Sequence, residues 1–182
     1  LIPLFPDPYV HMGGYDPVPF DCAKNKSAVT AAYKLSPDDD LIIYYRRRQK
    51  EVLKDILINK TLIYWANTNI NILKLYDADD VVHWYGPGYP PADMKNKKIV
   101  SSWIRTNMDA GVGNYLGIRE TTYITWLELY NLPLHKDFVA KKMNALGVEV
   151  VLWSHTSNEW THHLKLWMRA SVIGEKFWNT NI

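Results

Sequence analysis

The chain has 182 residues, enough for one domain with a sizeable core, and a formal net charge of only +2. Acidic and basic residues are interspersed, which gives no reason to expect a polyanion-binding protein, and no apolar run is long enough to span a membrane. Eight tryptophans and twelve tyrosines fit either a large core or a sugar-binding surface, because pyranose faces stack on indole rings.

The predicted elements alternate between strand and helix. Strands are expected at 8–12, 62–65, 81–84, 99–102 and 148–153, and helices at 36–58, 91–96, 136–146 and 164–178. The first helix should begin with Ser36 as N-cap, followed by Pro37 and an acidic first turn. The run Arg46-Arg47-Arg48 is expected on its solvated face, and Gly147 is expected to close the helix at 136–146.

The strands are short and apolar and show no clear polar alternation. That pattern is typical of a parallel sheet covered by helices, either an α/β barrel or a doubly wound sheet. No glycine-rich phosphate loop favours the doubly wound sheet. Several strands end in Trp, His or Asn, and the carboxyl ends of strands carry the site in barrel enzymes.

Two separated motifs carry a family resemblance. The stretch 9–16 reads Tyr-Val-His-Met-Gly-Gly-Tyr-Asp and resembles the His-x-Gly-Gly-Asp-Glu signature of glycoside hydrolase family 20, the β-N-acetylhexosaminidases. The stretches 147–153, 166–171 and 174–178 resemble that family's last strand, which ends in Trp, and its closing helix. The motifs stand in the family's order, with Trp-ended strands between them.

The resemblance implies a TIM (β/α)₈ barrel, of which residues 1–182 would be the C-terminal portion, supplying about strands four to eight and the closing helix. A complete barrel of this type needs about 250 residues. The start at Leu1 has no Met and no signal peptide, so the chain is expected to be processed from a precursor. Strands one to three would come from an N-terminal fragment or another chain.

The resemblance also implies an altered catalytic pair. In the family, hydrolysis is assisted by the substrate, whose acetamide oxygen attacks C1. The Asp of the signature orients the acetamide, and the Glu protonates the leaving oxygen. Here Tyr15 replaces the Asp and Asp16 replaces the Glu. Tyr carries no negative charge near neutral pH, and Asp is shorter by about 1 Å, a misplacement that can cost about 10²-fold in rate.

Matched position by position, Trp65, Trp84 and Trp153 fall where the family places the indoles around the N-acetyl group and sugar ring. A Trp at a strand end is more often a core residue, but three in matching places favour a pocket. Asp109 would keep a contact to a sugar hydroxyl, and Asn107 stands where the family has a Tyr that binds the acetamide oxygen.

His155 stands where the family has a Glu that accepts from sugar hydroxyls, so this wall is altered as well. His11 matches the signature His and is expected to be structural, beneath the site. No metal site and no cofactor are expected, because the adjacent His162 and His163 point to different sides of a helix.

Cys22 lies where animal members of the family have a Cys bonded to one upstream of the fourth strand, so the resemblance implies a disulfide to the other fragment. A free buried thiol is the plainer alternative. Asn25 and Asn59 begin N-glycosylation tripeptides, which favours a secreted or lysosomal protein. The protein is also expected to form an oligomer. It is not expected to bind nucleic acid or to span a membrane.

Three functions remain open at this point. The first is a pseudo-enzyme with a structural or glycan-binding role, as the altered acidic pair indicates. The second is an active or re-specialised glycosidase that uses Asp16 as general acid. The third is a structural subunit without an open pocket.

Overall fold

The computed structural model describes residues 4–14, 26–36, 41–66, 77–86, 89–91, 93–102, 106–109, 123–133, 144–153 and 157–179. The chain divides into two compact units, Leu1–Asp80 (unit 1) and Val81–Ile182 (unit 2). Across the described ranges, no helix has both the length and the apolar character to cross a membrane.

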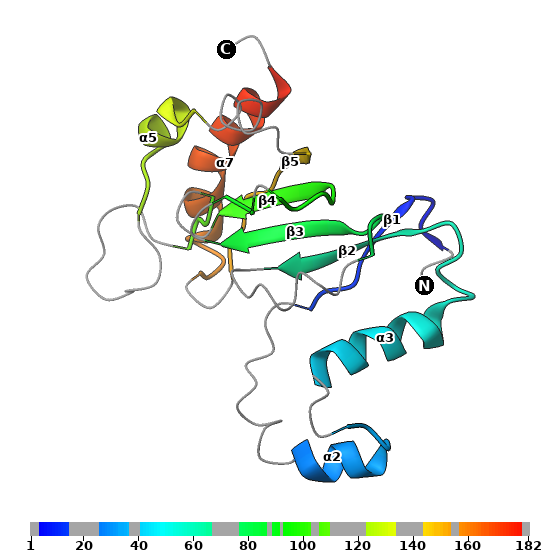
Figure 1. The fold of residues 1–182 in the computed structure, drawn as a ribbon. Helices are drawn as coiled ribbons and strands as arrows, with labels where there is room; N and C mark the ends of the chain where they lie inside the picture. The colour runs from blue at the N-terminus through cyan, green and yellow to red at the C-terminus, as the bar shows by residue number, and fades with distance from the viewer. Residues whose placement is uncertain are drawn as a thin grey trace. The chain divides into compact units, whose positions relative to one another are not determined.

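Unit 1 contains two strands and two helices. They are β1 (Tyr9–His11), α2 (Lys26–Ala32), α3 (Leu41–Leu53) and β2 (Thr61–Ala66). β1 and β2 are parallel neighbours, with His11 opposite Ile63 (Figure 1). Two parallel strands need a crossover connection, and α2 and α3 lie within it. The strands expected at 8–12 and 62–65 are thereby confirmed.

The core of unit 1 lies on one face of these strands. Leu62 and Tyr64 of β2 are buried with Leu57, and Val10 and Met12 pack against them. Because side chains alternate across a strand, this packing directs Ile63 and Trp65 to the opposite face. The alternation therefore separates the core side of β2 from the side that carries Trp65.

The helix expected at 36–58 is shorter in the structure. α3 ends at Leu53, and the residues that follow form turns, in which the amide of Leu57 donates to the carbonyl of Leu53 at 2.9 Å. Residues 37–40, with the expected acidic first turn, lie outside the described part of the chain. The expectation of a solvated basic face is wrong for Arg46, which is 6% exposed, because its guanidinium reaches a backbone carbonyl of the signature.

Unit 2 contains three strands and two helices. They are β3 (Val81–Gly86), β4 (Lys98–Ser102), α5 (Trp126–Asn131), β5 (Ala145–Val148) and α7 (His162–Trp178). β3, β4 and β5 form consecutive parallel pairs, and Figure 1 shows β3 and β4 as neighbouring arrows that point the same way. Tyr85 lies opposite Ser101. A further parallel bridge joins Asn107 to Val151.

The core of unit 2 packs helices against one face of its strands. Met108, Leu129 of α5 and Ile173 of α7 are buried together, and Val148, Val150 and Leu152 pack against them. The residues between these positions therefore face the other way. This second face carries Asn107, Asp109, Val151 and Trp153, and it is where the candidate site lies.

Three expected elements differ from the structure. No helix forms in the described part of 91–96, where the amide of Met94 donates to the carbonyl of Pro91 in a turn. The helix expected at 136–146 cannot end at Leu146, because Ala145 begins β5. The strand expected at 148–153 instead spans Ala145–Val148, because Gly147 pairs with Ile99 and is not a helix cap.

Candidate functional site

The signature loop of unit 1 continues the pairing of β1 with β2. The amide of Met12 donates to the carbonyl of Ile63 at 2.8 Å, and the amide of Trp65 donates to the carbonyl of Gly13 at 3.0 Å. Gly13 and Gly14 have φ of 71° and 82°, in the left-handed region that favours glycine. The two glycines therefore turn the chain directly before Tyr15 and Asp16, which lie outside the described residues.

Arg46 of α3 holds this turn. Its Nη2 donates to the carbonyl oxygen of Gly14 at 2.7 Å, and its guanidinium lies over the ring of Tyr64 at 5.3 Å from the centroid. A Cβ on Gly14 would lie 2.8 Å from Nη2 of Arg46. Glycine at this position thus serves both the backbone conformation and the close approach of the guanidinium.

Beside Arg46, a second cation packs on the same tyrosine. Nζ of Lys50 forms ion pairs with Asp77 at 2.5 Å and Asp80 at 2.7 Å, and lies 5.5 Å from the ring centroid of Tyr64. Burial raises the pKa of Tyr64 to about 12. The network ties α3 to β2 and to the segment 77–80, so α3 is fixed where it can reach the signature loop.

His11 contacts its own loop and Trp65. Its Nδ1 accepts a hydrogen bond from the amide of Gly13 at 3.0 Å, and its ring lies 5.2 Å from Trp65, tilted by 54°. Desolvation lowers the pKa of His11, which favours the neutral imidazole that can accept from Gly13. The arrangement supports a role in shaping the loop.

In unit 2, Tyr85 joins two of the candidate site residues. Its phenol oxygen accepts from Nδ2 of Asn107 at 2.8 Å and from Nε1 of Trp153 at 3.1 Å. The rings of Tyr85 and Trp153 meet edge to face, with centroids 6.1 Å apart. Tyr85 was not among the residues expected in the site, although its place one residue before the end of a buried strand was a usable signal.

Asn107 and Asp109 serve the framework around Trp153. The amide of Trp153 donates to Oδ1 of Asp109 at 2.5 Å, and the amide of Asp109 donates to Oδ1 of Asn107 at 2.8 Å. Both polar side chains are 1% exposed, whereas Trp153 is 37% exposed. Trp153 is thus partly exposed, while its backbone is bonded to the buried Asp109, which is bonded in turn to the buried Asn107.

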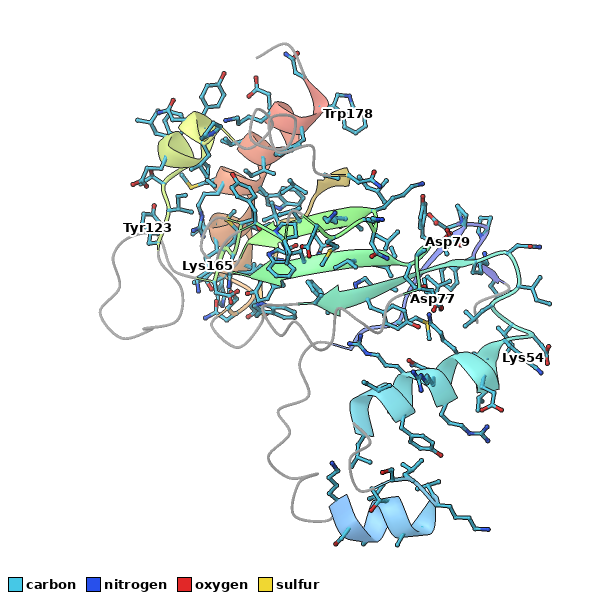
Figure 2. The ribbon with its side chains drawn as sticks, in the orientation of Figure 1. Lys54, Asp77, Asp79, Tyr123, Lys165 and Trp178 are labelled. Carbon is cyan, nitrogen blue, oxygen red and sulfur yellow. The ribbon has the colours of Figure 1, made fainter. Side chains whose placement is uncertain are left out.

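Two cations of α7 fix the same segment from the helix side. Nζ of Lys165 donates to the carbonyl of Asp109 at 3.1 Å, and Nη2 of Arg169 donates to the carbonyl of Met108 at 2.8 Å. The Arg169 guanidinium also lies over the ring of Tyr123 at 5.3 Å. Figure 2 shows Lys165 toward one end of α7, with Trp178 at the other. The closing helix therefore anchors the strand that supports Trp153.

Trp84 lies on the opposite face of β3 from Tyr85. It is 3% exposed, and a Cβ on Gly86 would lie 2.9 Å from its ring, as expected for residues two apart in a strand. The structure thus links Trp153, Asn107 and Asp109 with Tyr85, whereas Trp84 lies on the other face of β3. Trp65 lies in unit 1 with His11.

A buried polar cluster occupies the same face of β3 and β4 as Tyr85. Nε2 of His83 lies 2.8 Å from Oγ of Ser101, and that hydroxyl donates to the carbonyl of Glu149 at 3.2 Å. His83 and Ser101 are both fully buried. Burial raises the pKa of Glu149, whose carboxylate is 3.7 Å from His83.

Several predicted positions lie outside the described residues, so their geometry stays a prediction: Tyr15, Asp16, Cys22, Asn25 and His155. Asn59 is exposed and has a φ of 62°. Among the residues that the structure does describe, no three His, Cys, Asp or Glu side chains gather as a metal site would require.

Residues 1–181 match the family model of the glycosyl hydrolase family 20 catalytic domain. The chain belongs to glycosyl hydrolase family 20. The rat β-hexosaminidase subunit alpha is 27% identical over 185 residues, which cover 98% of this chain and 34% of that protein. The Ostrinia furnacalis chitooligosaccharidolytic β-N-acetylglucosaminidase is 24% identical over 147 residues, which cover 74% of this chain and 25% of that protein.

The fold agrees with the family. The family 20 exo-β-N-acetylglucosaminidase from Vibrio harveyi, solved with N-acetylglucosamine, superposes with a TM-score of 0.66 at 16% identity, covering 98% of this chain and 29% of that one. Parallel strands with their helices thus form part of an α/β barrel, which confirms the expected fold class. The chain spans about a third of the length of the curated relatives it matches.

Proposed function

We propose that this family 20 chain belongs to a hexosaminidase-like protein with strongly reduced hydrolysis and a glycan-binding or structural role. One observation carries the proposal. The backbone of the signature turn is present, with Gly14 held by Arg46, but Tyr15 and Asp16 follow where the signature has Asp and Glu. The loop that would present the catalytic pair is retained, while the chemistry of the pair is changed.

The replaced residues have different tasks in the cleavage of the glycosidic bond. Substrate-assisted hydrolysis needs a negative charge beside the acetamide as its oxygen attacks C1, and Tyr15 is neutral near pH 7. The step also needs an acid within reach of the leaving oxygen. Asp16 offers a carboxyl group, but its side chain is shorter by one methylene. Because both requirements are impaired at once, we expect hydrolysis of simple N-acetylglucosaminides near background.

A glycan-binding role is supported by the way Trp153 is held. Its backbone amide is bonded to Asp109 and its indole nitrogen to Tyr85, while more than a third of the residue stays exposed. An aromatic platform held in place before binding costs little entropy when a sugar ring stacks on it. The loss of polar contacts should leave the affinity in the millimolar range, which corresponds to roughly 4 kcal/mol.

The rest of the barrel is also part of the proposal. We place residues 1–182 as the C-terminal portion of the catalytic domain, with the other strands supplied by residues outside these 182 or by a second polypeptide. In the two-polypeptide form, Cys22 would link the pieces by a disulfide. Native material run on gels with and without reductant tests this form, because a band of about 21 kDa in both lanes contradicts it.

We further propose a secreted or lysosomal-type location, which the tripeptides at Asn25 and Asn59 support. A second function keeps some support from Asp16, because a carboxylic acid still follows the fixed turn at Gly14. In that case the protein is a re-specialised glycosidase acting on glycans that contain N-acetylhexosamine, with Asp16 as general acid.

The proposal is tested on the full-length protein that contains these residues, with two measurements on one preparation. Calorimetric titration with N-acetylglucosamine should show weak binding, and a chromogenic β-N-acetylglucosaminide should show background release. The double variant Tyr15→Asp with Asp16→Glu should regain a trace of release, because it restores both carboxylates. Unaltered background in that variant, beside binding by the wild type, would place the defect elsewhere, for instance at Asn107 and His155.

A further inference from the structure

The phenol oxygen of Tyr85 lies between side chains that come from two other segments of unit 2. Asn107 donates to it from the short segment after β4, and Trp153 donates to it from the segment after β5. A phenol oxygen has two lone pairs, so both acceptor positions are used by these donors. Tyr85 is therefore the point at which three neighbouring chain segments are joined by side chains.

The hydrogen bond to Tyr85 fixes a different part of Trp153 from the bond to Asp109. The carboxylate of Asp109 accepts from the backbone amide of Trp153, which fixes the position of the main chain at this residue. The indole has one N–H and no acceptor, and this N–H donates to Tyr85. The edge-to-face contact, with an interplanar angle of 85°, adds a second restraint on the ring plane.

The supports of Tyr85 are themselves rigid. Its strand pairs with β4 over five consecutive positions, and it lies opposite Ser101, which is fully buried. Asn107, its other partner, is held by the amide of Asp109, whose carbonyl is bonded to Lys165 of α7. The orientation of the Trp153 indole is thus determined by buried groups, although the indole itself is exposed.

We infer that Tyr85 is a positioning residue that sets the indole plane on which an N-acetylhexosamine ring stacks. The inference rests on the proposed glycan-binding function and adds the residue that determines its geometry. Without the phenol oxygen, the indole keeps its backbone anchor at Asp109 but loses its N–H partner. A sugar would then have to order the ring as it binds, which weakens the affinity.

The test compares Tyr85→Phe with the wild type in the full-length protein. Phe keeps the ring and removes only the oxygen. Tyr130→Phe is the matched control, because Tyr130 lies on α5 of the same unit and Lys176 contacts its ring and its backbone carbonyl, both of which Phe retains. The first readout is hydrogen exchange of the Trp153 indole N–H, observed by NMR with labelled tryptophan and assigned with Trp153→Phe. The second is the Kd for N-acetylglucosamine.

In Tyr85→Phe, we expect faster exchange at the Trp153 indole and a Kd raised about three- to tenfold, as loss of one hydrogen bond gives. Tyr130→Phe should match the wild type in both. Unchanged indole exchange in Tyr85→Phe would overturn the positioning role, and faster exchange with an unchanged Kd would overturn its part in recognition. Absence of binding by the wild type would instead contradict the proposed function, while the exchange measurement would still decide whether Tyr85 orients the indole.

Discussion

Nη2 of Arg46 donates a hydrogen bond to the carbonyl oxygen of Gly14 at 2.7 Å, so a helix residue holds the backbone directly before the altered pair. The guanidinium is buried between this carbonyl and the ring of Tyr64. A charge-assisted bond from a buried guanidinium is costly to break, because the buried cation loses this partner. This chain thus combines a firmly held signature turn with the changed residues Tyr15 and Asp16.

The two glycines of the turn should differ in their tolerance of alanine. Both have positive φ, so Gly13→Ala and Gly14→Ala each cost about 1–2 kcal/mol of unfolding free energy. A Cβ at Gly14 also displaces Arg46, whereas a Cβ at Gly13 meets nothing within 4 Å. Chemical denaturation should therefore show the larger loss for Gly14→Ala. Equal losses would mean that the contact with Arg46 contributes nothing.

Tyr64 should make the protein sensitive to alkali. Burial raises its folded pKa to about 12, so between pH 10 and 12 the unfolded state releases the phenol proton first. The unfolding free energy from this group is fully present below pH 10 and falls by about 1.4 kcal/mol per unit above it. Chemical denaturation at pH 9, 10 and 11 should show that the unfolding free energy decreases less with pH in Tyr64→Phe than in the wild type. Parallel curves for variant and wild type would refute the prediction.

The unfolding free energy of Tyr64→Phe should still decrease somewhat at alkaline pH, because Lys50 contributes in the same direction as Tyr64. Burial lowers the pKa of Lys50, but hydrogen bonds to Asp77 and Asp80 outweigh it and leave the pKa raised. Stability from a raised lysine pKa is present below the unfolded pKa and lost as pH rises through the folded one. The variant should therefore retain a residual alkaline loss.

Asn59 should carry a glycan in native material. It is exposed, lies in the turn between α3 and β2 and has a φ of 62°, which Asn tolerates better than most residues. Mass spectrometry of peptides from the native source should find Asn59 modified, and Thr61→Ala should abolish the modification during secretory expression. Unmodified Asn25 and Asn59 in native peptides would contradict the secretory assignment.

Trp153 and Trp84 should respond differently to substitution, although both match indole positions of the family. Trp153→Ala removes exposed indole surface and should abolish measurable binding of N-acetylglucosamine with little loss of stability. Trp84 is buried on the other face, so Trp84→Leu should lower the unfolding free energy by on the order of 2 kcal/mol and leave Kd near the wild-type value. Wild-type affinity in Trp153→Ala would eliminate the stacking model.

Much of the fold could be predicted from local sequence patterns. The five expected strands correspond to five parallel strands, and the last helix begins at His162, two residues before its expected start. The errors arose where pairing decides the structure: Gly147 looks like a helix cap, yet it pairs with Ile99 in β5. α5 was missed, although Thr125 and Glu128 form a capping box that the sequence displays.

The site was only partly predictable, because side-chain partners depend on the strand face and on neighbouring strands. Trp84 was expected in the pocket because it matches a family indole position, and its role there stays a prediction. Tyr85, the next residue of β3, was not expected in the site, yet its phenol oxygen accepts from Trp153. Arg46 was expected in solvent because it begins a basic run, and its carbonyl partner lies 32 residues away. Single-sequence patterns carry no information on such distant partners.

The most direct test of the central claim is the turnover of a chromogenic β-N-acetylglucosaminide by the full-length protein, measured beside Asp16→Asn. The account predicts release near background for both proteins, because Tyr15 supplies no charge to the attacking acetamide and Asp16 is short. Turnover at a rate typical of hexosaminidases, lost in Asp16→Asn, would contradict it and establish Asp16 as a working general acid.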